Sequence, residues 1–357
     1  MSKVKELNFE GQTIFCALDV HKKSWRTNIR DTDFELENYS QDPDPQALVA
    51  HLKKKYPGAN YQVAYEAGFC GFGIQRFLQQ AGIDCIIVNP ADVPSSDRDI
   101  RRKTDTVDAR KISRELSKGG LKGIYVPSEE MEHARSLVRQ RTRLVRDQTR
   151  CKNRIWHLLM FSGLQLQPDD GPMKHWGRRF VDSLRRLGCP SAPLRLTLDI
   201  ALEEYLQVRK LLSTATRHIR ALSRQPAFEG TQKLLQTIPG IGLVNAMVIM
   251  TEVQDMARFK TLDKLCSFAG IVPDTDSSGE SEKSRGITHR NNDYLRPAVV
   301  ESSWMLIRKD PAMLMKYRKY CSAMNPNKAI IKIAKHLLSR IRYVWANKVG
   351  YEKAVVA

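Results

Sequence analysis

Short apolar runs alternate with segments of helical spacing through the first hundred residues. The apolar runs are bounded by polar turns, a pattern that predicts strands at 13–20, 25–29, 61–65 and 85–88. Apolar positions that recur every three or four residues predict helices at 46–55 and 71–81. Because strands alternate with helices, we expect an α/β sheet covered by helices.

The pattern changes near residue 131 to a long, basic, helical stretch. Its apolar positions Leu137, Leu144, Cys151 and Leu158 stand at seven-residue spacing, which predicts a coiled-coil arm. Residues 194–222 are a candidate for its antiparallel mate. The alternative is a pair of ordinary surface helices.

The last third holds helical patterns without clear strand alternation. A chain of 357 residues is long enough for more than one core. We therefore predict three parts: an α/β domain at 1–126, a basic coiled-coil arm at 127–228 and a mostly helical domain at 229–357.

The net charge of +19 favours a polyanionic partner, since Lys and Arg that neutralise phosphates release counterions. Nucleic acid is the leading candidate, and a solubilising surface charge or a membrane-surface protein is the alternative. The chain lacks an apolar leader and any run of about 18 apolar residues, so no membrane span is expected. Its seven cysteines are scattered without zinc spacing, which indicates reduced thiols.

Four carboxylates carry the most informative pattern: Asp19 in the first apolar run, Glu66 at the end of a later strand, and Asp105 and Asp108 in KTDTVDAR. An i, i+3 spacing places the last two on one face of a helix. Clustered carboxylates hold Mg²⁺, or Mn²⁺, for two-metal phosphoryl transfer.

Each acid alone has an ordinary explanation, such as a helix cap or an exposed loop. The order strand-Asp, strand-Glu, helix-Asp-x-x-Asp is much rarer, and it is the order found in RNase H-like nucleases of the RuvC type. We therefore predict a RuvC-like fold for residues 1–126.

Two segments downstream are candidates for further chemistry. In TIPGIG (237–242), Gly240 and Gly242 flank an apolar residue before a predicted helix, the pattern of a helix-hairpin-helix turn that binds DNA phosphate or of a plain connector. Residues 274–290 are rich in Ser, Gly and basic residues, and composition alone predicts a solvated loop.

The strings ALDVHK (17–22), YEAG (65–68), VNP (88–90) and KTDTVDAR (103–110), followed by IPGIG (238–242), FAGIVP (268–273), SSG (277–279) and RGIT (285–288), resemble DEDD transposases of the insertion-sequence 110 family. The resemblance covers most of the chain in the same order. It implies a DNA transposase whose RuvC-like domain binds Mg²⁺ through the four acids and whose C-terminal domain supplies Ser278 as nucleophile.

The resemblance also implies partners: donor and target DNA, a bridge RNA that guides target choice, and further copies of the chain in a dimer of dimers. It implies a cytoplasmic protein of a prokaryotic nucleoid. We expect nucleic acid to contact the turn glycines and the basic residues Arg101, Arg102, Lys103, Arg139, Arg143, Arg146, Arg150 and Arg285.

The sequence departs from the family pattern after RGIT, where a lysine and a glycine are common but His289, Arg290, Asn291 and Asn292 stand. Ser277 is therefore an alternative to Ser278 as nucleophile. Two other functions stay open: a junction resolvase in which water attacks, and a nucleic-acid-binding protein without catalysis.

Overall fold

The computed structural model describes residues 8–94, 105–165, 176–278 and 281–353, without the side chains of 105–106, 275–278 and 281–285. The chain divides into two compact units, an N-terminal unit (Met1–Val126) and a C-terminal unit (Pro127–Ala357). Among the described residues, no helix is long and apolar enough to cross a membrane. The further division of the second unit at residue 228 stays a prediction.

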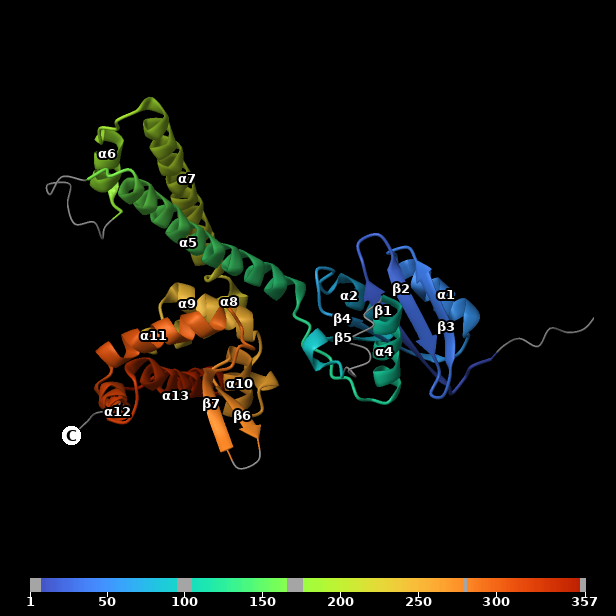
Figure 1. Ribbon diagram of the computed structural model, residues 1–357. Coiled ribbons are helices and arrows are strands. Elements are labelled where there is room, and N and C mark those ends of the chain that lie inside the picture. The colour runs from blue at the N-terminus through green and yellow to red at the C-terminus, as the bar shows by residue number, and fades with distance from the viewer. Residues whose placement is uncertain (1–7, 95–104, 166–175, 279–280, 354–357) are drawn as a thin grey trace, which may run out of the picture. The chain divides into compact units, whose positions relative to one another are not determined.

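A mixed sheet of five strands forms the centre of the N-terminal unit (Figure 1). Its strands lie in the order β3-β2-β1-β4-β5; β1 runs antiparallel to β2 and parallel to β4. The remaining pairs are β2–β3, antiparallel, and β4–β5, parallel. The bounds are β1 Thr13–Val20, β2 Trp25–Arg30, β3 Glu35–Gln41, β4 Asn60–Glu66 and β5 Asp84–Val88.

Helices cover both faces of this sheet, because alternate residues of the central strands are apolar on both sides. Cys16 and Leu18 of β1 pack with α1 (Pro45–Lys55) and α2 (Gly73–Gln80). Phe15 and Ala17 face the opposite side, where they pack with Ile112 of α4 (Asp105–Ser117).

The sequence pattern did not predict β3 (Glu35–Gln41). This strand lies at the edge of the sheet and carries the polar sequence ELENYSQ, whose side chains are exposed or half-buried. An edge strand with no buried face lacks the apolar alternation on which such a prediction depends. The other four strands were predicted at nearly the observed bounds.

The C-terminal unit begins with a helical arm, formed by α5 (Glu129–Phe161) and α7 (Ala192–Leu222) lying side by side (Figure 1). The two helices run antiparallel, since Arg141 bonds to Thr216 whereas Arg154 bonds to Glu204. The short helix α6 (Arg178–Arg186) lies at the far end of the arm, where Phe180 and Leu184 join a separate apolar cluster with Ile155.

The other end of the arm packs into a larger core built by the remaining helices. Ala134 and Val138 of α5 and Ile219 of α7 belong to this core, together with the nearly all-apolar α9. The helices are α8 Pro226–Gln236, α9 Leu243–Val253, α10 Leu262–Ala269, α11 Leu295–Lys309, α12 Pro311–Cys321 and α13 Pro326–Asn347, with short 3₁₀ turns at Pro90–Asp92 and Met256–Arg258.

Residues 274–290 do not form the loop expected from their composition. The structure places an antiparallel hairpin there, β6 (Pro273–Ser278) and β7 (Ser281–Ile287). The strand sequences PDTDSS and SEKSRGI have no apolar stripe. Backbone pairing and anchors at the base therefore specify a structure that hydrophobic patterning does not reveal.

Candidate functional site

Asp19 and Glu66 lie beside one another at the carboxyl ends of two adjacent parallel strands. Each directly follows a residue of the paired register Leu18↔Tyr65 between β1 and β4. Asp19 shares the sheet face of Phe15 and Ala17, and Glu66 that of Ala64, so both carboxylates belong to the face covered by α4. Sequence positions 47 apart thus converge at one edge.

Asp19 is accessible and already has one polar neighbour. Its side chain is 22 % exposed, and Oδ2 lies 3.2 Å from Nε2 of His21. Glu66 is half-buried at the end of β4. A carboxylate at the end of a buried strand is costly to desolvate, so this pair is the strongest feature of the N-terminal unit that points to chemistry.

Asp105 and Asp108 lie in the first turn of α4. Ala109, Ile112 and Leu116 form the buried stripe of this helix, and the i, i+3 and i, i+4 spacing places both Asp positions along that stripe. The Asp108 side chain is half-buried, whereas that of Asp105 lies outside the described residues.

Oxygen ligands of this kind suit a hard divalent cation. Asp19 and Glu66 fit this requirement as a neighbouring pair. Among the described side chains, however, no three His, Cys, Asp or Glu residues lie close enough together to hold a metal ion. The four-carboxylate set accordingly stays a prediction, with Asp105 outside the described side chains.

The two candidate nucleophiles lie at the last two positions of β6, where Ser277 pairs with Glu282 and Ser278 with Ser281. Their side chains, and that of Arg285 on β7, lie outside the described residues. The basic run Arg101, Arg102 and Lys103 also lies outside them. Neither the choice between the two serines nor these basic contacts is tested.

The base of the hairpin is fixed by bonds to the helical core. The backbone N–H of Thr288 donates to the carbonyl of Val272 at 3.0 Å. Arg296 of α11 donates from Nη2 to the carbonyl of Thr288 at 2.5 Å. Gly270 ends α10 in the left-handed conformation, and a Cβ at this position would collide with Asn291.

Asn292, one of the residues that departs from the family pattern, joins the segment after the hairpin to the core. Its Oδ1 accepts from the N–H groups of Tyr294 and Leu295 and so caps α11, while Nδ2 donates to Glu252 Oε2 at 2.8 Å. Glu252 is 2 % exposed and also binds Arg139. Glu252 was not among the residues predicted from the sequence, although a carboxylate near the end of an apolar helix indicates a buried partner.

Three of the four α5 arginines assigned to nucleic acid have partners within the protein. Arg139 binds Glu252, and its guanidinium lies over the ring of Tyr294. Arg146 also lies over this ring and donates to the carbonyl of Asp293, and Arg150 pairs with Asp147. The fourth, Arg143, is exposed. Arg139 therefore has a structural role that its position in a basic run does not indicate.

The two turn glycines differ in their surroundings. Gly240 has φ +94°, and a Cβ there would meet the backbone of Ser302 and Leu306 in α11. This close helix packing explains Gly240 without a ligand. Gly242, at the N-cap of α9, has open space around it, so phosphate contact at this position stays a prediction.

Comparison with known proteins gives two family matches. Residues 16–162 match the IS110-type DEDD model, described as a transposase, and residues 232–318 match the model of the transposase IS116/IS110/IS902 family. The first match spans the sheet with Asp19 and Glu66 and continues through α5. The second spans Glu252, the hairpin and Asn292.

Curated relatives agree with these matches. The protein y4qE of Sinorhizobium fredii, named as a candidate transposase, is 30 % identical over 240 residues, which are 67 % of this chain and 57 % of that protein. The transposase of insertion sequence element IS1111A from Coxiella burnetii is 26 % identical over 65 % of this chain and 62 % of its own length. The chain thus spans less than two thirds of these two relatives. The ordered pair of matches shows that this chain belongs to the IS110 family of DEDD transposases.

Proposed function

We propose that this protein is a transposase that cuts and exchanges DNA strands in a divalent-metal-dependent reaction. The observation that carries the proposal is the convergence of Asp19 and Glu66 at adjacent strand ends, within the segment matched by the DEDD transposase model. The net charge of +19 supports a polyanionic substrate.

An RNase H-like fold for the N-terminal unit is part of this proposal. The strand order β3-β2-β1-β4-β5, with an antiparallel meander joined to two parallel strands, supports it. In such a sheet the catalytic acids project from the ends of the central strands. We likewise interpret the antiparallel α5–α7 pair as a coiled-coil arm.

Asp19 and Glu66 would hold the metal together with Asp105 and Asp108 from α4, the helix that covers the same face of the sheet. Mg²⁺, or Mn²⁺ in its place, supplies charge stabilisation for phosphoryl transfer when bound. The carboxylates would hold such a cation where the parallel strands end, and Glu66 is half-buried there.

Ser278 at the end of β6 is the proposed nucleophile. Its Oγ attacks the phosphorus of a phosphodiester and forms a phosphoserine, while one P–O bond to a deoxyribose breaks. The serine proton passes to a basic group or water, and the departing sugar oxygen takes up a proton. Reversal with a different DNA hydroxyl completes the exchange without net hydrolysis.

The proposed assembly is a dimer of dimers on two DNA duplexes, guided by a bridge RNA. In this arrangement the carboxylates of one copy serve the serine of another. Sequencing of RNA that copurifies with the native protein tests the guide: a discrete transcript from the edge of the element supports it, and only degraded host RNA contradicts it.

The serine assignment is tested with a DNA substrate whose released strand is too short to stay bound, so that a covalent intermediate accumulates. The native protein and Ser277→Ala should yield a protein–DNA adduct resistant to denaturation, mapped by mass spectrometry to Ser278. Ser278→Ala should yield none.

Other results identify the alternatives. Cleavage retained in Ser278→Ala without any adduct would indicate attack by water, as in a junction resolvase. DNA binding without cleavage by the native protein in Mg²⁺ or Mn²⁺ would indicate a protein that only binds nucleic acid. An adduct on Ser277 would move the nucleophile by one position.

A further inference from the structure

An arginine-lined depression opens on the helical arm, outside the carboxylate and serine segments. It has a volume of about 390 Å³, and its cationic lining residues are Arg141 from α5 with Arg209, Arg217 and Arg220 from α7. A second depression adjoins it and shares Arg209, Ser213 and Arg217. The sequence pattern of α5 drew attention to a different set of arginines.

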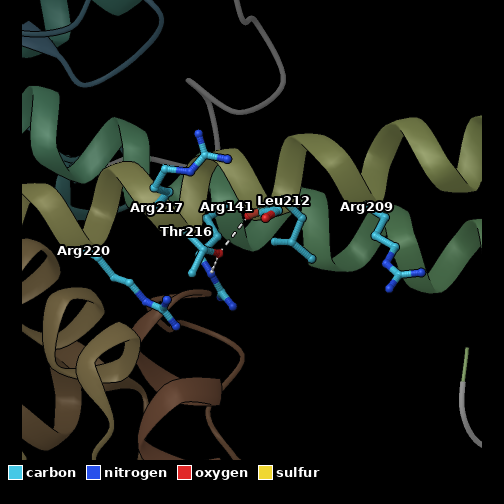
Figure 2. Close-up of a pocket in the computed structure, with 7 residues that line it drawn as sticks. Arg141, Arg209, Leu212, Thr216, Arg217 and Arg220 are labelled. Atoms are coloured by element: carbon cyan, nitrogen blue, oxygen red, sulfur yellow. Dashed lines mark hydrogen bonds between the residues drawn. The ribbon is translucent and has the colours of Figure 1, made fainter. Parts of the chain in front are cut away.

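The guanidinium groups of Arg220, Arg141 and Arg209 reach the same side of the helix pair, in that order along it (Figure 2). Arg209 and Arg220 are eleven positions apart, a spacing of just over three complete turns, so they share one face of α7. Arg217 points to the other side of the ribbon in this view. The depression is thus bordered by a row of three cations.

These cations lack the carboxylate partners that several other arginines of the arm have. Arg150, Arg154 and Arg195 each form an ion pair. Within the described part of the chain, no Asp or Glu forms an ion pair with any of the four arginines of the depression. The charges of Arg141, Arg209 and Arg220 therefore accumulate on one surface.

Arg141 is the most constrained of the row. It is half-buried, and its Nε donates to Thr216 Oγ1 at 3.0 Å, which orients the guanidinium toward the depression. Burial lowers the pKa of Arg141 from its ordinary value, and Glu301 acts in the opposite direction. A guanidinium in a protein stays charged under these conditions, so a half-buried cation faces the opening without a paired anion.

The geometry points to a binding site for the DNA phosphate backbone on this face of the arm, formed by Arg141, Arg209 and Arg220. The distance along α7 from Arg209 to Arg220 is about 16 Å at 1.5 Å per residue. One strand of duplex DNA places a phosphate every 3.4 Å or so along its axis, so each guanidinium meets a separate phosphate. Arginine donates bidentately to such oxygens.

The assignment of DNA as the ligand of this site rests on the proposed function. Contacts to phosphates carry no base specificity. They would fix the position of the arm along a duplex independently of the metal and serine chemistry. Ser213, which lines both depressions, supplies a hydroxyl that can donate to the same backbone.

The test measures the affinity of the full-length protein for a labelled duplex of random sequence, in EDTA, across a salt series. The variant Arg141→Gln/Arg209→Gln/Arg220→Gln should reduce the slope of log K against log salt by about 2.7, since each lost phosphate contact contributes about 0.9. Between 50 and 200 mM salt, its affinity should therefore fall about 40-fold less than that of the native protein.

The matched control is Arg154→Gln/Arg178→Gln/Lys233→Gln, which removes the same charge from residues already paired with carboxylates. It should keep the native slope. If the first variant does not fold, as judged by circular dichroism, Arg209→Gln/Arg220→Gln carries the test, with an expected reduction of about 1.8.

If the native protein binds DNA and the variant has the same slope of log K against log salt, the site is overturned. A reduced slope on duplex RNA but an unchanged slope on DNA would also overturn it and would assign the face to RNA. Absence of DNA binding by the native protein would contradict the proposed function itself.

Discussion

Arg139 of α5 binds both carboxylate oxygens of Glu252 in α9, through Nε and Nη2, each at 2.7 Å. The Glu252 side chain is 1 % exposed and that of Arg139 33 % exposed, so this ion pair is largely withdrawn from water. Asn292 donates to the same carboxylate. One buried acid therefore connects the arm, the helical core and the segment that follows the serine hairpin.

Removal of the buried Glu252 carboxylate should destabilise the protein more than removal of an exposed carboxylate. Glu252→Ala leaves the half-buried Arg139 and the Asn292 amide without their shared acceptor, and we expect a loss of about 3 kcal/mol in the free energy of unfolding of the C-terminal unit. Urea denaturation measures it. Glu204→Ala breaks the exposed pair with Arg154 and should cost far less, because water screens such a pair. Comparable losses for the two variants would contradict the structural role of Glu252.

Gly240 and Gly242 provide a matched pair of substitutions in one turn. Gly240→Ala places a methyl group against the backbone of α11 at a positive φ, and it should cost about 3 kcal/mol through overpacking and backbone strain. Gly242→Ala has open space and should cost under about 1 kcal/mol. Thermal denaturation of the two variants measures the difference, and equal melting temperatures would refute the packing explanation for Gly240.

Asp19→Asn should abolish strand cleavage, with a loss of at least about a thousandfold, if this carboxylate holds the cation. It should also remove the rise in melting temperature that Mg²⁺ produces by binding the folded state.

Asp84→Asn is the control for that measurement. Asp84 is exposed at the start of β5, at the opposite end of the parallel strands, and the variant loses the same charge. Its cleavage and its response to Mg²⁺ should match the native protein. Cleavage retained by Asp19→Asn would contradict the metal assignment.

His336 predicts a pH dependence of stability. Burial lowers its pKa, as do Lys316, Arg340 and Lys335, in decreasing order. The unfolded chain binds a proton at the His336 imidazole more readily than the folded chain does. The stability that the neutral imidazole contributes is therefore complete above about pH 6.5, and it is lost as pH falls through the lower pKa of the folded state. His336→Gln should therefore lose less stability than the native protein between pH 7.5 and 5.

The glutamine amide of the His336→Gln variant keeps a polar group near the Tyr320 hydroxyl. In the native protein this hydroxyl lies 2.9 Å from Nε2 of His336. His157→Gln, at an exposed position of α5, should leave the pH profile of unfolding unchanged. If the stability of His336→Gln depends on pH as that of the native protein does, another group governs the loss of stability at acid pH.

The sequence predicted elements that bury apolar stripes and failed where no stripe exists. The central strands and both arm helices were predicted because apolar residues such as Leu18, Leu144 and Cys151 recur at regular spacing. Strand β3 and the hairpin β6–β7 were missed, since the sequences of both lack an apolar stripe. Pairing between distant strand edges leaves little periodic trace in the sequence.

The candidate site also contains residues that the sequence predicted and residues that it did not. Asp19 and Glu66 were chosen by their order along the chain, and the β1–β4 register accounts for their adjacency. Glu252 and Asn292 were missed because their importance depends on a contact between residues 40 positions apart. The arginines of α7 were overlooked because charge density along α5 does not show which cations are already paired.

The length of α5 has a consequence for the geometry of the whole unit. It is one helix of 33 residues, with Ala134 and Val138 in the large core and Ile155 and Leu159 in the cluster near α6. One residue inserted between these ends would turn the tip by about 100° and advance it by about 1.5 Å. The helical register of α5 therefore sets both the rotation and the distance of the tip relative to the large core.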